Sequence, residues 1–200
     1  MLIEQCSEKT KQSNTKANAS FHSGFTLIEL VVVIVILAIL AIFALPRFAD
    51  LQDQAELNSI EYIASSLGVG VETVKLTFAA KGHSTRVQNL EGFGDGTIDT
   101  NNIGYPIGTG KGTGNENIGQ GATGCVDVWG AVLQSPPSVA NGNNNSDYRS
   151  YRHTGNKVCS YAYRLNGDTA GRNRSQLVIR YDSRDGTVDV CGRRSDIPNC

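Results

Sequence analysis

The chain has 200 residues, enough for one modest domain with an appended segment. Its formal net charge is −1 and it has no basic block, which argues against nucleic-acid binding, because such a surface needs clustered cations. Hydrophobic residues form 40% of the chain but are distributed unevenly. Residues 30–45 are apolar without a break, whereas Gly, Asn, Thr and Ser become frequent after Lys81.

The first element in chain order is a polar segment, residues 1–24, followed by a hydrophobic span. An ordinary secretory signal is cut after its apolar core, but here the distinctive junction, SGFTLIEL at residues 23–30, comes before it. Residues 25–45 would form a helix of about 31 Å, which matches a hydrocarbon core of about 30 Å. Glu29 is the one charged residue in this span. A carboxylate in a membrane span is costly and is functional by default, unless Glu29 merely reaches the membrane interface.

The sequence GFTLIEL followed by an apolar helix resembles the prepilin signature of type IV pilins and type II secretion pseudopilins. The resemblance implies that a membrane aspartyl peptidase removes residues 1–24 by cutting after Gly24 and then methylates the nitrogen of Phe25. We expect Glu29 to pair with the α-amino group of Phe25 on a neighbouring subunit, an attraction strengthened by apolar surroundings. The implied partners are this peptidase, an inner-membrane assembly platform, and other pilin subunits, including minor pilins.

Residues 46–81 are predicted to continue the helix in amphipathic form. Pro46 removes one backbone hydrogen bond and favours a kink or break, but the helical pattern resumes after it, and Lys81-Gly82 is a plausible end. Gly68 and Gly70 each weaken the helix by up to about 1 kcal/mol. The apolar positions recur mainly every three or four residues: Phe48, Leu51, Ala55, Ile60, Ile63, Leu67, Val71, Val74 and Phe78.

Residues 82–124 contain twelve glycines, which favours a long surface loop over regular structure. Asp95, Asp99 and Asn101 loosely resemble a calcium-binding loop, but their spacing does not match the EF-hand pattern. A solvated loop rich in Asx turns is the favoured interpretation.

The last third is predicted to contain a short helix and a small sheet. Residues 125–134 read as the helix, with Val128, Val132 and Trp129 toward a core, and the prolines at 136 and 137 end it. Asp185-Gly186 is a hairpin signal. Strands are expected at 148–153, 158–165, 176–181 and 187–191. The predicted fold class is α+β: a long N-terminal α-helix, with a transmembrane half and an amphipathic half, packed on a small antiparallel sheet in a head of residues 82–200.

Four of the five cysteines remain after removal of the leader, which contains Cys6. An even number in a small exported domain predicts two disulfides, against the alternatives of free thiols or a metal site. From chain order we expect Cys125 to pair with Cys159, which opens a strand that could cover it. Cys191 would then pair with Cys200 and tie the tail to the sheet.

We expect no catalytic site, metal or cofactor. No Cys-x-x-Cys pair occurs, and His22, His83 and His153 do not cluster. No nucleophile elbow, metal motif or phosphate-binding loop brings reactive groups together.

The head also is similar, in patches, to pilins of the mannose-sensitive haemagglutinin system. The similarity rests on residues 104–108 (GYPIG), on Cys125-x-x-x-Trp129, and on Cys159 with its Tyr-rich strand. It implies a pilin fold and an adhesive fibre that leaves the inner membrane for the surface of a Gram-negative bacterium, with a carbohydrate as a candidate receptor. The alternative is a type II secretion pseudopilin.

Overall fold

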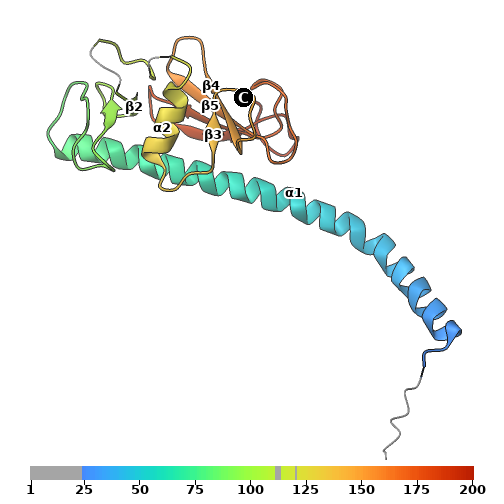
Figure 1. Ribbon diagram of the computed structural model, residues 1–200. Helices are drawn as coiled ribbons and strands as arrows, with labels where there is room; N and C mark the ends of the chain where they lie inside the picture. The colour runs from blue at the N-terminus through green and yellow to red at the C-terminus, as the bar shows by residue number, and fades with distance from the viewer. Residues whose placement is uncertain (1–23, 111–113, 120) are drawn as a thin grey trace, which may run out of the picture. The chain divides into compact units, whose positions relative to one another are not determined.

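A computed structural model describes residues 24–110, 114–119 and 121–200. The chain divides into two compact units, Met1–Phe48 and Ala49–Cys200. The expected long helix is present as α1 (Leu27–Ala80), which contributes residues to both units (Figure 1). It passes through Pro46 without interruption.

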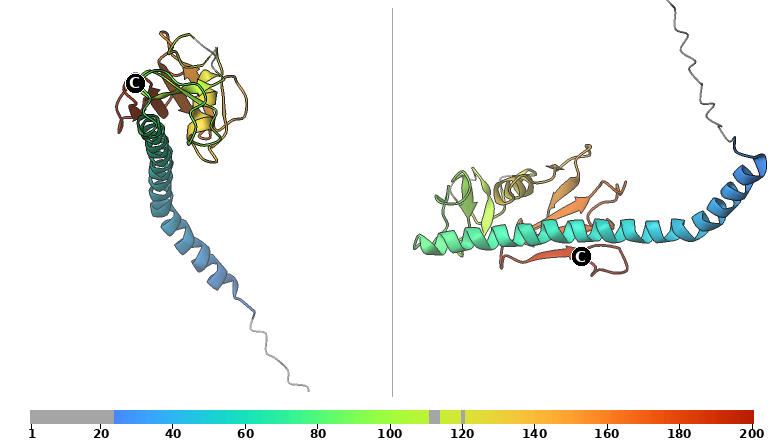
Figure 2. Two further views of the ribbon diagram at one scale, coloured as in Figure 1. Left: turned by 90° about the vertical axis from the view of Figure 1, so that its left-hand side faces the viewer. Right: turned by 90° about the horizontal axis from the view of Figure 1, so that it is seen from below.

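The core of the second unit is built on one face of α1. Its buried residues follow alternating steps of four and three, so they form a single stripe along the helix: Ile60, Ala64, Leu67, Val71, Val74 and Phe78. This stripe belongs to the same apolar cluster as residues of α2 (Gly124–Val132) and of the main sheet. Figure 2 shows the sheet and α2 lying along this part of α1.

The main sheet has five strands in the order β3-β4-β5-β6-β7. The four expected strands are present, and their pairs are antiparallel. The expected α+β fold is thus confirmed, and a fifth strand, β3, joins the edge of the antiparallel sheet parallel to β4. The strands are β3 (Val139–Ala140), β4 (Tyr148–Arg152), β5 (Val158–Tyr163), β6 (Val178–Asp182) and β7 (Val188–Cys191).

Strand β3 could not be recognised from its two residues, which are too few to show alternation. It is held in place by two flanking side chains that bond reciprocally. The Ser138 backbone N–H donates to Asp147 Oδ2 at 2.8 Å, and the Asp147 N–H donates to Ser138 Oγ at 2.9 Å. These bonds align the two segments before the strand pair begins.

The expected short helix is confirmed as α2, with Val128, Trp129 and Val132 buried. The Trp129 ring lies 4.5 Å from that of Tyr161 and 5.0 Å from that of Tyr148, measured between centroids. Its indole N–H donates to the Pro137 carbonyl at 3.0 Å. Trp129 is therefore a core residue with its polar group satisfied.

The prediction of a surface loop across residues 82–124 was wrong for much of this segment. It contains a two-stranded sheet of β1 (Ile98–Thr100) and β2 (Pro106–Thr109). Glycine here permits close packing: a Cβ on Gly104, whose φ is +93°, would lie 2.8 Å from the Phe78 ring. The segment also contributes five side chains to the core: Leu90, Ile98, Tyr105, Ile107 and Ile118.

Candidate functional site

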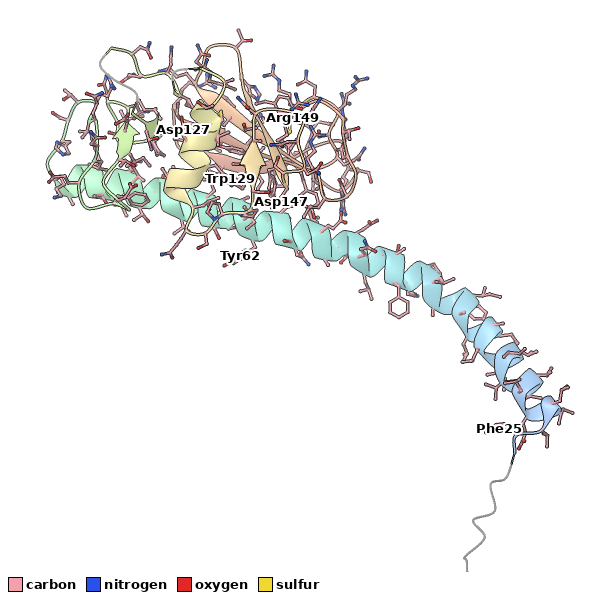
Figure 3. The ribbon with its side chains drawn as sticks, viewed as in Figure 1. Phe25, Tyr62, Asp127, Trp129, Asp147 and Arg149 are labelled. Carbon is pink, nitrogen blue, oxygen red and sulfur yellow. A yellow bond between two sulfur atoms is a disulfide. The ribbon has the colours of Figure 1, made fainter. Side chains whose placement is uncertain are left out.

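Gly24 and Phe25 lie at the exposed start of the described chain. A Cβ built on Gly24 would meet no other atom within 4 Å, so the protein's own packing does not require glycine at this position. The Phe25 side chain is 82% exposed, and Figure 3 shows it beside the first turn of α1. A requirement for glycine would therefore come from an external enzyme that must approach the backbone closely.

Glu29 takes part in a reciprocal cap at the N-terminus of α1. Its Oε2 accepts hydrogen bonds from the Thr26 N–H and from Thr26 Oγ1, both at 2.9 Å. The Glu29 N–H donates back to Thr26 Oγ1 at 3.3 Å. This is a capping box, which satisfies two of the N–H groups that a helix start leaves free. The order Thr-x-x-Glu at residues 26–29 is the sequence signal for this cap.

Beyond this cap, α1 is apolar around its whole circumference from residue 30 to residue 45. The helix contains an 18-residue window with a mean hydropathy of 3.3, none of it buried, and its length and composition suffice to cross a membrane. Of residues 27–48, every side chain is exposed except that of Ala44, which is half-buried. Such a surface requires lipid or other apolar helices around it.

Residues 20–45 match the prokaryotic N-terminal methylation motif. The match supports a type IV pilin-like or pseudopilin protein, a kind of structural subunit that a prepilin peptidase processes and that assembles with other pilin subunits. It does not distinguish pili from secretion pseudopili. No curated protein and no solved structure matches the chain.

The matched motif begins within the expected leader. The leader as far as residue 23, with Cys6 and His22, lies outside the described residues. The cut after Gly24, the methylation of Phe25 and the assembly role of Glu29 therefore stay predictions.

Four cysteines lie in the head as two disulfides. Cys125 at the start of α2 is joined to Cys159 in β5, and Cys191 at the end of β7 is joined to the final residue, Cys200. Cys125 and Cys159 are fully buried, whereas Cys200 is exposed. Formation of these two bonds in the exported protein stays a prediction.

The three residues that loosely resemble a calcium-binding loop, Asp95, Asp99 and Asn101, lie at turn and core positions. Asp95 Oδ1 accepts bonds from the N–H and hydroxyl of Thr97, as in an Asx turn. Asp99 and Asn101 are buried, so the prediction of a solvated loop was wrong for them. Asn101 Oδ1 accepts the Tyr105 N–H at 2.9 Å and so shapes the turn between β1 and β2. Among the described residues, no three potential metal-binding side chains cluster.

One histidine–serine contact occurs in the head. His153 Nε2 lies 2.7 Å from Ser160 Oγ, but Ser160 is only 1% exposed and cannot reach a substrate. Burial, Arg172 and Arg180 lower the pKa of His153, which favours its neutral form. The pair is therefore a structural hydrogen bond within the head.

Proposed function

We propose that this chain is a subunit of an adhesive type IV pilus of the mannose-sensitive haemagglutinin type. The observation that carries the proposal is the methylation motif at residues 20–45, which includes the exposed apolar start of α1. The head supports an extracellular destination, because two disulfides are suited to an oxidising compartment.

In this proposal the subunit starts in the inner membrane of a Gram-negative bacterium, held by residues 25–45. Cleavage after Gly24 creates an α-amino group on Phe25, four positions before Glu29. A carboxylate and an ammonium group on adjacent subunits neutralise each other where apolar helices surround them. The same helices then exchange lipid for one another as the fibre grows, with minor pilins and the assembly platform as further partners.

A direct test is mass spectrometry of the surface form. The mature chain is expected to start at Phe25 with one additional methyl group, and Gly24→Val is expected to leave uncut precursor in the inner membrane. Since a side chain at Gly24 meets no protein atom, this variant should fold as the wild type does. An intact leader, or a cut after Leu45, would contradict the proposal.

The second candidate is a pseudopilin of a type II secretion system, since both groups carry this N-terminal motif. The four head cysteines and the resemblance around Trp129 support the pilus. Sheared surface fibres composed mainly of this chain would support the pilus. Loss of secreted enzymes on deletion, with no such fibre, would support the pseudopilin.

We also propose that the head can bind a carbohydrate, although not through buried Trp129. A more suitable surface is a groove of about 750 Å³ lined by residues 142–146, 164–165 and 167–169 together with Arg149. Figure 3 labels Arg149. It offers amide side chains at 143–145, and the Arg149 guanidinium lies 4.9 Å from the Tyr151 ring centroid. Replacing Asn144 and Asn145 with alanine is expected to weaken sugar-inhibitable adhesion without changing the number of fibres.

A further inference from the structure

Charge is strongly segregated within the second unit. Residues 49–80 of α1 contain five carboxylates and one lysine, whereas residues 148–200 contain nine arginines and one lysine against five aspartates. The net charge of −1 conceals this division. Only charges that are not already paired within the chain are available to bind a partner.

Four of the nine arginines in residues 148–200 are paired with a carboxylate of the same chain. Each lies within ion-pair distance of a nearby aspartate: Arg164 with Asp168, Arg180 with Asp189, Arg184 with Asp182, and Arg194 with Asp196. The other five have no carboxylate within that distance among the described residues. Two of these bond elsewhere, Arg149 to the Asn143 side chain and Arg152 to the Ile118 carbonyl. The remaining three are Arg172, Arg174 and Arg193. We call these three the arginine patch.

The arginine patch is assembled from two segments that bind each other. The Arg193 N–H donates to the Ser175 carbonyl, and its Nε donates to the Asn173 carbonyl, both at 3.0 Å. These bonds hold Arg193, two residues after the end of β7, against the loop that carries Arg172 and Arg174. Arg172 and Arg193 line a groove of about 520 Å³ at this junction, which Cys200 also lines. Arg174 and Arg193 are exposed, so the patch is accessible to a partner.

The complementary feature is a row of carboxylates on α1, which we call the acidic row: Asp50, Glu61 and Glu72. Eleven residues separate each from the next, close to three helical turns, so they lie in one line along the helix. All three are exposed. Glu72 lies 3.9 Å from Lys75, whereas Asp50 and Glu61 have no cation within ion-pair distance in the described part of the chain.

Within one subunit, no ion pair joins the arginine patch to the acidic row among the described residues. The sheet-region arginine that bonds α1, Arg194, donates to the backbone carbonyl of Asp53 at 2.9 Å and is itself bound to Asp196 at 2.7 Å. A patch and its complement at different places on one molecule form a heterologous contact, and such contacts build helical filaments when the rotation does not close. Complementary charge chiefly sets the register and the specificity of such a contact.

We propose that the arginine patch of one subunit binds the acidic row of a second copy of this chain. This inference rests on the proposed function, because it assigns the contact that sets the register of neighbouring heads in the fibre. An anionic polymer, such as DNA or a sulfated glycan, would present the same negative charge to the patch. A copy of this chain is favoured because the chain itself contains the unpaired carboxylates.

Charge reversal tests the contact in the full-length chain. Arg174→Glu with Arg193→Glu, and separately Asp50→Lys with Glu61→Lys, are each expected to lower the yield of sheared fibres at least about tenfold, because like charges then face each other. All four changes in one chain restore opposite charges and should bring the yield back. Arg184→Glu reverses the charge of one exposed arginine outside the patch and should assemble as the wild type does.

The controls separate this contact from the proposed function. Every variant is expected to be cut and methylated normally, and to show both disulfides on non-reducing gels, so that a loss of fibres is not a loss of processing or folding. Normal fibre yield in both charge-reversed double variants would overturn the contact. A quadruple variant that yields no more fibres than the two double variants would overturn it as well. Normal fibres that no longer bind DNA or heparin after reversal of the patch would overturn it in favour of a polyanion. Wild-type cells without processed fibres would instead refute the proposed function.

Discussion

Glu29 has two structural roles that substitutions can separate. Its carboxylate caps α1 through Thr26, and in the proposed fibre it pairs with the amino group of a neighbouring Phe25. We expect Glu29→Leu to insert into the membrane and be processed, but to form few or no fibres, because the paired charge is lost. Thr26→Ala removes the hydroxyl's two hydrogen bonds in this cap and keeps the carboxylate.

The Thr26→Ala variant is therefore the matched control for Glu29. It should retain most fibre formation, since losing an N-cap side chain costs about 1 kcal/mol of helix stability and leaves the charge in place. Immunoblots of sheared fibres and of the membrane fraction measure both variants. Equal defects in the two would show that the cap, and not the inter-subunit pair, is the essential feature.

His153 makes the stability of the head depend on pH. Its pKa is lowered from 6.5 by burial and by the nearby Arg172 and Arg180. Between the folded and unfolded pKa values the unfolded chain binds more protons, so the free energy of unfolding falls as pH drops below about 6.5. The melting temperature of fragment 49–200 should therefore fall less between pH 7 and pH 5 in His153→Asn than in the wild type. An identical fall in both proteins would assign the dependence to other groups.

At the scale of elements, two glycines of α1 give opposite expectations for the same substitution. A Cβ on Gly70 would lie 2.5 Å from Val132 Cγ1 and 3.0 Å from the Val132 carbonyl oxygen. A Cβ on Gly68 would make an ordinary contact with Val188 at 3.8 Å. Gly70→Ala should therefore destabilise the head by about 1–3 kcal/mol through overpacking against α2.

Gly68→Ala is the matched control, and it should stabilise α1 by up to about 1 kcal/mol because alanine has the higher helix propensity. Urea unfolding of fragment 49–200 gives both values. Stabilisation by both substitutions would mean that α2 does not need the missing side chain at Gly70.

The two disulfides differ in the length of chain that they close. The bridge between Cys125 and Cys159 spans 34 residues, and that between Cys191 and Cys200 spans 9. Loop-closure entropy gives about 3.8 kcal/mol for the first and about 2.6 kcal/mol for the second. Replacing the first pair by alanine should therefore lower the free energy of unfolding more than replacing the second.

Peptide mapping without reduction is the control for this comparison. It should recover Cys125 linked to Cys159, while mild reductant opens the bridge of exposed Cys200 first. A peptide linking Cys125 to Cys191 would show that the pairing is wrong.

Elements with a repeating side-chain pattern were predictable, and those held by backbone geometry were not. The stripe on α1 and the strands after Tyr148 follow helical or alternating patterns, so their packing could be read from the residues. Strands β1 and β2 depend on Gly104 and on the turn bonds of Asn101, which leave no such pattern. The arginine patch joins residues 172–174 to Arg193, and only the fold reveals that contact.

At the scale of the whole molecule, α1 exposes a second apolar seam besides its buried stripe. Tyr62, Val69 and Leu76 are seven residues apart and 71%, 68% and 66% exposed. Seven-residue spacing is typical of helices that pack along one another, and Figure 3 shows Tyr62 on the side of α1 away from α2. The seam is therefore suited to contact between subunits.

Replacing Tyr62 and Leu76 with serine is expected to lower the temperature at which fibres dissociate, since each buried apolar side chain contributes about 1.5–3 kcal/mol. The unfolding of fragment 49–200 should hardly change, because both side chains are exposed in the isolated head. Ala79→Ser, an exposed change on the same helix outside this spacing, serves as the control. A parallel loss of head stability would show that the seam belongs to the subunit's own core.

The burial of Cys125 and Cys159 imposes an order of events in time. Both thiols have no exposed surface once α2 has packed on the sheet, so no oxidising catalyst can reach them in a finished head. In the proposed export route, their bond is expected to form after the head leaves the cytoplasm and before it finishes folding. Cys200 stays at the surface, so the second bond can close later and can be remade after damage. In the proposed fibre, the head would thus contain one disulfide that forms only before folding is complete and one that can re-form afterwards.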